Sequence, residues 1–420
     1  MIENIKNMFG MGGGSNDTDD PRTAEHKERA KAYEKQWQYY QSQQKEQLKV
    51  AKAGPNHNII DNWTSSIIDQ AISFLMGGGV EFETDSAAVE NMFLDDPMSD
   101  FSKDRFLIEL AQTGIMAGTA FVQVHNFRPH VVNPAYVDIL PDGGGYHIIR
   151  MVDKKWIRER IEPLESVDGL IMAWETVIEE RPESSNEWQE VDRLLWEYSF
   201  PPMFHIQNLP LHGSLYGMPL VKGQMSQDAI NATVSNIKKI LYYFAHPWLI
   251  GRGFTANTTE AMETGAGKML VLPKPESNID LMEMGGDLSA SSNFKDDRVN
   301  AMHETNGSTY LDPDKMVAGS KSGTALRILL GKPLRTMENM RLTYGAGLQK
   351  LCMMAQILNG ETPEPVGVMW SDPLPRNVTE MIDNFVKLVQ YMSPYAAAIQ
   401  AGFTEEQAQA MQESEVDVPL

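Results

Sequence analysis

The stretch MVAGSKSGTALRILL, residues 316–330, joins a loop of small residues to an apolar helical pattern. Backbone N–H groups at a helix N-terminus favour anions, so the loop GSKSG (319–323) could hold a phosphate. A phosphate-binding βαβ unit places a strand before such a loop, and no strand pattern precedes this one. Two interpretations remain open. The loop is an ordinary helix start, with Ser322 or Thr324 near the N-cap, or it projects and touches a passing ligand.

The residues after the loop predict a long helix. Apolar side chains recur at helical spacing from Leu326 to Leu358, as expected for one buried helix face. A helix of about 35 residues would extend roughly 50 Å. Pro333 should kink this helix early, because a proline ring clashes with the preceding turn.

The remaining segments predict a mixture of helices and antiparallel strands. Helices are expected from Pro21 to Gly54-Pro55, within 60–76, over 101–117, from Gly217-Met218-Pro219 to His246, over 289–305, from about Val378, and near the end, where Thr404 and Gln407 have capping-box spacing. Strands are expected in VEFET (80–84), in segments between Phe121 and Phe200, in WLIGRGF (248–254), KMLVLPKP (268–275), NIDLMEM (278–284) and VGVMW (366–370). The expected fold class is therefore α+β.

The composition indicates an acidic globular protein. The chain has 420 residues, with 57 acidic and 36 basic side chains and a formal net charge of −21. Tight nucleic-acid binders usually carry a basic patch, whereas the richest basic stretch here, Lys45, Lys49 and Lys52, includes Glu46 and is typical of a solvated helix face. Cys352 is the only cysteine, so no intrachain disulfide can form. The sequence contains no signal-peptide pattern and no apolar stretch of bilayer length, so a soluble protein made in the cytoplasm is expected.

Catalytic signatures in this sequence are incomplete. TGAGKML (264–270) resembles a phosphate-binding loop, but Met262 and Met269 occupy the positions of its first glycine and of its Ser or Thr. HGSLYG resembles a nucleophile elbow with His212 in place of the first glycine. The nine histidines are scattered and have no cysteine partners. We therefore expect no catalytic residue, no metal and no cofactor.

Four short motifs follow one another along the chain. Their residues are His205, Ile206, Asn208, Gly217 and Pro219; Ala229 and Asn231; Ser322, Gly323, Ala325 and Leu326; and Trp370, Pro373, Pro375 and Asn377. In order and spacing they resemble the motifs of portal proteins of tailed bacteriophages. The segment 58–83 is also similar to the early helix and strand of that family, and the resemblance spans most of residues 56–390.

The resemblance implies a portal-like fold, with a wing of helices and antiparallel strands, a two-helix stem, a small β clip, a long kinked wing helix and a short helical crown. The implied parts are a disordered arm (1–21), the wing (22–217), the stem helices (218–246 and 289–305), the clip (247–288), the tunnel loop (306–322), the long wing helix with its following strand and helix (323–392), and the crown or tail (393–420). On this interpretation the loop at 319–323 faces a channel and does not bind a nucleotide.

The resemblance also implies which residues meet other molecules. Expected to face DNA in the tunnel loop are Asp314, Lys315, Met316, Val317, Ser320 and Lys321. Expected along the stem channel are Lys238, Lys239, Lys295 and Arg298. Expected to contact partners in the clip are Arg252, Lys268, Lys274 and Glu276.

The implied assembly is a homo-oligomeric ring, commonly of twelve subunits, at one vertex of a virion capsid, formed in the host cytoplasm during assembly. Its implied partners are double-stranded DNA, bound weakly and without sequence preference, the terminase motor, the major capsid and scaffolding proteins, and a head-tail adaptor. No membrane is expected. Two alternatives remain, another acidic structural virion protein such as a minor capsid component, and an enzyme that processes nucleotides or esters through the incomplete motifs.

Overall fold

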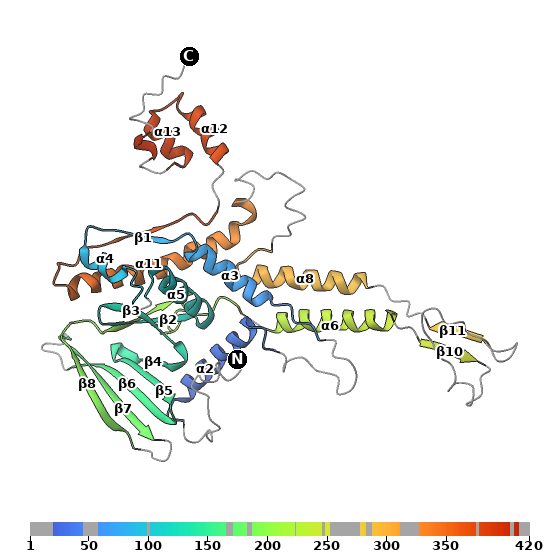
Figure 1. Ribbon diagram of the computed structural model, residues 1–420, viewed down its shortest axis with the longest axis horizontal. Coiled ribbons are helices and arrows are strands. Elements are labelled where there is room, and N and C mark those ends of the chain that lie inside the picture. The colour runs from blue at the N-terminus through green and yellow to red at the C-terminus, as the bar shows by residue number, and fades with distance from the viewer. Residues whose placement is uncertain are drawn as a thin grey trace. The chain divides into compact units, whose positions relative to one another are not determined.

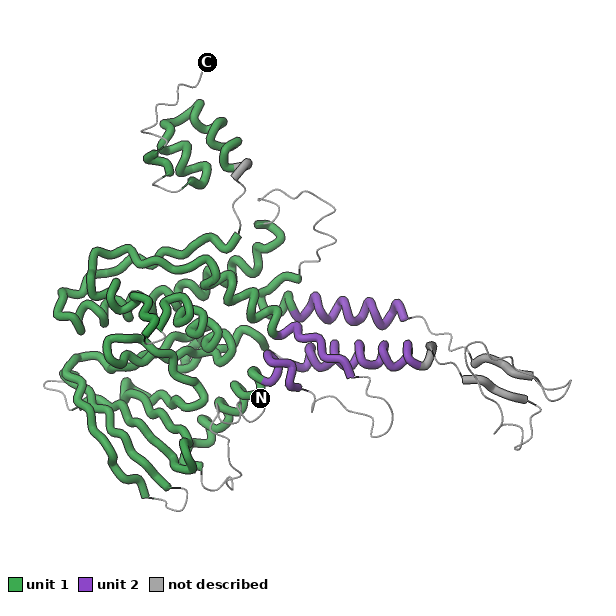
Figure 2. Tube along the Cα trace, in the orientation of Figure 1, with its two compact units in different colours: residues 1–37, 65–222, 303–420 green, residues 38–64, 223–302 purple. Residues whose placement is uncertain are grey.

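The computed structural model describes twelve parts of the chain (Figure 1): residues 20–44, 58–98, 101–164, 171–182, 187–222, 224–245, 248–252, 278–282, 288–310, 327–374, 378–403 and 407–410. The chain divides into two compact units (Figure 2). Unit 1 comprises residues 1–37, 65–222 and 303–420, and unit 2 comprises residues 38–64 and 223–302. Unit 2 is thus inserted twice into the sequence of unit 1.

The described residues form helices and antiparallel sheets, which confirms the α+β class. The helices are α2 (Ala24–Tyr40), α3 (Trp63–Met76), α4 (Ala87–Phe93), α5 (Lys103–Ala117), α6 (Met225–Ala245), α8 (Ser289–Thr305), α11 (Gly331–Leu358), α12 (Val378–Leu388) and α13 (Pro394–Ala401), with short 3-10 turns η2 (Pro134–Tyr136) and η3 (Pro141–Gly143). The strands are β1 (Val80–Glu83), β2 (Thr119–His125), β3 (Arg128–Val132), β4 (Val137–Leu140), β5 (Gly145–Val152), β6 (Lys155–Pro163), β7 (Trp174–Pro182), β8 (Gln189–Trp196), β9 (Met203–Gln207), β10 (Trp248–Arg252), β11 (Asn278–Met282) and β12 (Gly367–Trp370).

Two antiparallel sheets of unit 1 pack face to face around one hydrophobic core. The larger sheet has the order β4-β5-β6-β7-β8 and the smaller one the order β3-β2-β9. Alternate residues of β4, Val137 and Ile139, are buried, while Asp138 between them is partly exposed, as expected for a strand with one face in the core. The antiparallel β region predicted as far as Phe200 is confirmed.

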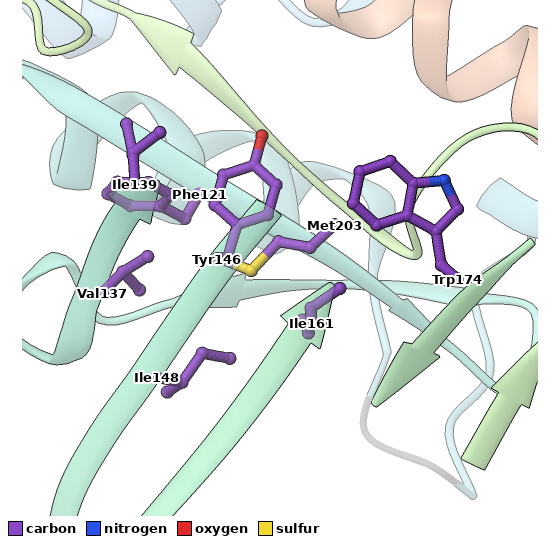
Figure 3. Packing of buried hydrophobic residues seen from close by; sticks show 8 residues of the cluster. All are labelled: Phe121, Val137, Ile139, Tyr146, Ile148, Ile161, Trp174 and Met203. Carbon is purple, nitrogen blue, oxygen red and sulfur yellow. The ribbon is translucent and has the colours of Figure 1, made fainter. Parts of the chain in front are cut away.

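The core between these sheets draws on both of them (Figure 3). Its members are Phe121 and Met203 from the smaller sheet and Val137, Ile139, Tyr146, Ile148, Ile161 and Trp174 from the larger one. All are at most one-tenth exposed. Because burial of each large apolar side chain contributes roughly 1.5–3 kcal/mol, this cluster anchors the part of unit 1 that carries the first motif.

Segments far apart in the sequence are joined at two other places in unit 1. Strand β1 pairs with β12, with Val80 opposite Trp370 and Glu83 opposite Gly367. Helix α11 packs against β9, and α5 packs against β2 and β3. The C-terminal strand and the long helix are therefore integral parts of unit 1.

The long helix differs from its prediction in length. Residues 327–329 are helical, Leu330 leaves the helical conformation, and α11 then runs for 28 residues from Gly331. The early kink predicted for this helix is present, but it lies at Leu330 and not at Pro333, so the long uninterrupted part begins at Gly331. Pro333 lies in the first turn of α11, where its missing N–H removes no helical hydrogen bond.

Two other helix boundaries were also predicted wrongly. Helix α6 begins at Met225 and not near Met218; the residues before it are instead bonded to unit 1, with the Met218 N–H donating to the Leu209 carbonyl at 2.8 Å and the Leu220 N–H to the Ile115 carbonyl at 2.9 Å. Helix α2 ends at Tyr40, and Ser42 has a left-handed φ of 59°. The predicted helical residues around Lys45 lie outside the described residues.

Helix α4 was not anticipated from the sequence. It has seven residues and is capped by Ser86, whose hydroxyl accepts a hydrogen bond from the Val89 N–H at 3.4 Å. Of the arm predicted for 1–21, Asp20 and Pro21 are described, and Asp20 forms an ion pair with Arg22 at 2.7 Å. No helix in the described part of the chain is long and apolar enough to span a bilayer.

Unit 2 contains the two helices expected for a stem and two of the strands expected for a clip. Helix α8 covers the predicted residues 289–305. Strands β10 and β11 pair antiparallel, with Trp248 opposite Met282 and Arg252 opposite Asn278. The third predicted strand, 268–275, lies outside the described residues.

Candidate functional site

A row of buried polar side chains on α6 holds an extended segment of unit 2. Gln227, Asn231 and Ser235 are spaced four residues apart, so they share one helix face, and all are buried. They accept backbone N–H bonds from three residues, in the pairs Trp63 to Gln227 Oε1 (3.1 Å), Asp61 to Asn231 Oδ1 (3.1 Å) and Ile59 to Ser235 Oγ (2.9 Å). The Asn231 of the second motif is therefore a structural clamp on the segment before α3.

The first turn of α6 is also tied to the end of α2 within unit 2. The Tyr39 hydroxyl lies 2.8 Å from both carboxylate oxygens of Asp228. Burial, reinforced by this hydrogen bond to a carboxylate, raises the pKa of Tyr39, so the phenol remains a donor. The amino-terminal end of α6 is thus held from two sides.

The predicted stem cations lie on α6 and α8, where Lys295 is partly buried and the other three are exposed. Lys238 and Lys239 are exposed on α6. On α8, Lys295 lies 3.1 Å from Asp296, and the Arg298 guanidinium lies 5.6 Å from the centre of the Phe294 ring. The structure places two cations on each helix, and it adds acidic neighbours on α8 that the prediction did not include.

The predicted tunnel loop cannot be placed, but both of its flanks are described. Asp314, Lys315, Met316, Val317, Ser320 and Lys321 lie outside the described residues. Before them, Gln70 forms two hydrogen bonds of 3.3 Å with the backbone N–H and carbonyl of Thr309. Asn306 accepts the Lys222 N–H at 2.8 Å, and the His303 ring lies 2.5 Å from the Ser308 hydroxyl. The chain therefore enters 311–326 from a fixed position in unit 1.

The other flank is fixed by charged side chains beside β12. Arg327 forms an ion pair with Asp372. Arg341 of α11 donates to the Ser371 carbonyl at 2.7 Å and lies 5.1 Å from the centre of the Trp370 ring. Trp370 of the fourth motif thus lies beside the residues that fix the chain where its described part resumes after residue 326.

The first motif forms a tight joint between β9, α5 and α11. Asn208 is fully buried, and its N–H donates to the Gly118 carbonyl at 2.9 Å while its side chain bonds the Met218 carbonyl and the Tyr344 hydroxyl. At Gly217, a Cβ atom would lie 2.4 Å from the Gly118 carbonyl oxygen. Glycine is required there because two backbones touch.

The predicted clip residues are only partly described. Arg252 ends strand β10, while Lys268, Lys274 and Glu276 lie outside the described residues. Of the third motif, Ser322, Gly323, Ala325 and Leu326 also lie outside them, as do Pro375 and Asn377 of the fourth. Among the residues that the structure describes, no cluster of His, Cys, Asp and Glu side chains is suited to hold a metal ion.

Sequence comparison gives a family match for the second part of the chain. Residues 224–417 match the family model described as "Phage portal protein, SPP1 Gp6-like". This range contains α6, α8 and α11 and the second, third and fourth motifs, whereas the first motif precedes it. The resemblance to phage portal proteins is thereby confirmed. No curated protein matches the chain.

Solved structures of phage-like particles share low sequence identity with the chain. The neck of a native gene transfer agent (GTA) particle computed with C12 symmetry is 12% identical, with 81% of this chain and 90% of that chain covered and a TM-score of 0.49. The neck of an empty GTA particle computed with C6 symmetry is 11% identical, with 82% and 90% covered and a TM-score of 0.49. The virion of a native GTA particle is 12% identical, with 81% and 90% covered and a TM-score of 0.46.

Sequence reasoning missed the residues that fix the flanks of 311–326. Gln70 and Thr309 are 239 residues apart, and Arg327 and Asp372 are 45 apart. Such pairs cannot be predicted from a local motif, because each side chain taken alone has the character of an ordinary surface residue. Asn208 was found through its motif, although only the structure gives its role.

Proposed function

We propose that the chain is the subunit of a ring at one capsid vertex, through whose channel genomic DNA is packaged and ejected. The observation that carries this proposal is the portal-family match, which covers α6, α8 and the sequence between them. These are the elements that the resemblance assigns to stem and clip. Twelve subunits are proposed, in keeping with the commonest portal ring.

The exposed surface of the two stem helices supports an oligomer. Leu241 on α6 is 51% exposed and Phe294 on α8 is 49% exposed. Of the residues of α8, only Val299, Met302 and His303 are buried. A helix with so little buried surface is marginal alone in water, so packing against neighbouring copies would stabilise both helices.

The charge of the chain favours a channel that does not retain DNA. Twelve copies, each with a net charge of −21, would carry −252 formal charges. Phosphate contacts supply most of the affinity of non-specific DNA binding. A largely acidic wall with few cations, Lys238, Lys239, Lys295 and Arg298 on the stem and Lys315 and Lys321 in the tunnel loop, would give weak contacts without sequence preference.

We assign partner docking to the clip, whose paired strands β10 and β11 connect the stem helices in sequence. The terminase motor during packaging and the head-tail adaptor afterwards would use this segment, with Arg252, Lys268, Lys274 and Glu276 as contacts. The wing would meet the major capsid and scaffolding proteins. The assembly would form in the host cytoplasm and end in the virion.

Electron microscopy of the purified protein tests the proposal. End-on rings with a central hole are expected, and light scattering should give the mass of a closed oligomer. A well-folded monomer at all concentrations would contradict the ring. The competing function, a minor capsid component, predicts attachment to capsid shells without ring formation, so incubation with shells distinguishes the two.

A further inference from the structure

Strand β8 forms one edge of the five-stranded sheet of unit 1 (Figure 1). In the part of the chain that the structure describes, its only partner strand is β7, so the other side of its backbone is not paired with a strand there. Seven of its eight residues are exposed. Because N–H and C=O groups along such an edge can bond a further strand, β8 is a template for strand addition.

The opposite edge of the same sheet, β4, is protected by side chains. The Ile139 N–H donates to the Tyr216 hydroxyl at 2.7 Å, and this hydroxyl donates to Asp138 at 3.0 Å. Arg29 of α2 forms an ion pair with Asp138 and lies 4.0 Å from the centre of the Tyr216 ring. Edges are also protected by lysine or proline, but the sequence of β8, QEVDRLLW, contains neither. One edge of the sheet is therefore closed and the other is open.

The regular part of the open edge extends from Asp192 to Trp196. Asp192 lies opposite Ile178 of β7, and Trp196 lies opposite Trp174. Before Asp192 the register shifts, which leaves Val191 without an opposite residue. Because a bulge disrupts the ladder locally, an added strand would pair with the five residues 192–196.

Apolar side chains flank this part of the edge on both faces of the sheet. Leu194 and Leu195 are neighbours in the strand, so they point to opposite faces, and they are 49% and 57% exposed. On the face of Leu194, the Trp196 ring lies 5.2 Å from the Tyr198 ring. In strand addition, main-chain hydrogen bonds give affinity and contacts of alternate side chains give specificity. These apolar side chains favour an added strand that carries apolar residues of its own.

Acidic side chains determine the charge of the strand that fits. The segment 187–197 has one basic residue, Arg193, and four acidic residues, Glu187, Glu190, Asp192 and Glu197. Arg193 already forms ion pairs with Glu190 at 2.8 Å and with Glu175 at 2.6 Å. Opposite charges across paired strands are stabilising, whereas like charges are destabilising. The edge therefore favours a strand with lysine or arginine, and pairing of β8 with a second β8 is disfavoured.

We propose that the edge of β8 binds an extended basic segment of another protein, which adds to the sheet as a sixth strand beside residues 192–196. Its backbone would bond the free side of β8, and its apolar side chains would cover Leu194 and Leu195. Its lysine or arginine side chains would lie beside Asp192 and Glu197. A second copy of this chain is a poorer partner, because its net charge is also −21. The proposal does not depend on ring formation or on DNA.

Peptide binding to the full-length chain tests the proposal. The probe is a short fluorescent peptide in which lysine and valine alternate, and fluorescence anisotropy measures its affinity. A lysine–serine peptide of the same charge reports the general attraction to an acidic chain and should bind at least about tenfold more weakly, since serine buries no apolar surface. Methylation of alternate backbone nitrogens in the lysine–valine peptide removes the donors needed for pairing and should abolish the difference. Equal affinities of all three peptides would overturn the proposal.

Substitutions on β8 locate the binding site. Leu195→Lys introduces the residue that protects natural edges and should weaken binding of the lysine–valine peptide about tenfold. Leu342→Lys is the matched control, because it adds the same charge at a leucine of α11 that is 74% exposed. Equal effects of the two substitutions would contradict a site on β8.

Charge reversal provides a second variant at the same edge. Asp192→Lys should weaken binding of the lysine–valine peptide and strengthen binding of a glutamate–valine peptide. An unchanged preference would contradict the assigned charge of the partner. If Leu195→Lys prevents self-assembly and the peptide does not bind the assembled chain, the edge is covered by a second copy, and the proposal is overturned.

Discussion

Gln70 and Thr309 form two reciprocal hydrogen bonds of 3.3 Å, although 239 residues separate them in the chain. The Gln70 side-chain amide bonds both the N–H and the carbonyl of Thr309, as the backbone of a neighbouring strand would. The contact fixes the last described residues before 311–326, so the point from which the chain enters the proposed tunnel loop depends on a residue of α3.

We predict that Gln70→Ala lowers the free energy of unfolding by about 1 kcal/mol, since it leaves the Thr309 backbone without its partner. Urea denaturation measures this effect. Gln43→Ala, at a side chain whose amide donates to the exposed Gln41 Oε1 at 3.2 Å, should change stability by less than about 0.5 kcal/mol. Equal effects of both substitutions would show that the Thr309 contact adds no stability.

The tunnel-loop lysines should affect DNA and not assembly. Replacing Lys315 and Lys321 by alanine should leave the ring intact, because surface loop substitutions change stability by about 0.5 kcal/mol or less. The amount of DNA packaged or retained per particle should change. Lys31→Ala with Lys35→Ala on exposed α2 positions is the matched control. Normal DNA content in the Lys315, Lys321 variant would contradict the proposed contact, and failure of rings to form would favour a structural role for the loop.

Asn231 and Asn236 provide a matched pair on α6. Asn231 is buried and accepts the Asp61 N–H, whereas Asn236 is exposed. Asn231→Ala should destabilise the protein by about 1–3 kcal/mol, because the partly buried Asp61 N–H and the buried Gln227 amide both lose an acceptor. Asn236→Ala should have an effect within about 0.5 kcal/mol. Thermal or urea unfolding of both variants decides the matter, and similar losses would mean that the clamp on the segment before α3 is not energetically important.

Stability should fall in mild acid because of His26. This side chain is fully buried, its Nε2 lies 2.9 Å from the Ala135 carbonyl, and burial lowers its pKa from 6.5 to about 4. Between these pH values the unfolded chain binds a proton that the folded chain does not, so stability present above pH 6.5 is lost as the pH falls towards 4. The slope is at most about 1.4 kcal/mol per pH unit for one histidine.

His26→Gln keeps a donor for the Ala135 carbonyl without a titrating group. Its free energy of unfolding should therefore depend less on pH between 6.5 and 4 than that of the parent chain. His205, whose pKa burial also lowers to about 4, remains in both proteins as an internal reference. An unchanged pH slope in His26→Gln would show that this histidine does not control acid stability.

Local patterns predicted those elements whose ends are marked in the sequence itself. The bounds of α8 agree with the predicted 289–305, and strands such as β1 and β10 lie where their apolar residues indicated. The start of α6 was misplaced because Gly217-Met218-Pro219 has the composition of a helix start, while the N–H groups of Met218 and Leu220 donate to the Leu209 and Ile115 carbonyls of unit 1. Only the tertiary structure reveals these contacts.

The candidate site was less predictable than the fold. The motif singled out Asn208 without explaining why an asparagine is needed there. The structure explains it through the hydrogen bonds of Asn208 with Gly118 and Tyr344. Gln70 and Arg341 were not singled out at all. Their hydrogen-bond partners are distant in the sequence and are mostly backbone atoms. Because every residue type carries these atoms, the identity of the partner residue does not reveal the bond.

The pairing of β1 with β12 has a consequence for synthesis on the ribosome. Trp370 follows its partner Val80 by 290 residues, and at about 5–20 residues per second the second strand is made roughly 15–60 s after the first. During that interval the edge of β1 has no partner strand, and unpaired edges are prone to pair with other chains. The second part of unit 2, residues 223–302, emerges in the meantime, between two segments of unit 1. Nascent chains therefore carry an open strand for most of their translation, a period in which chaperone binding would decide how many subunits mature.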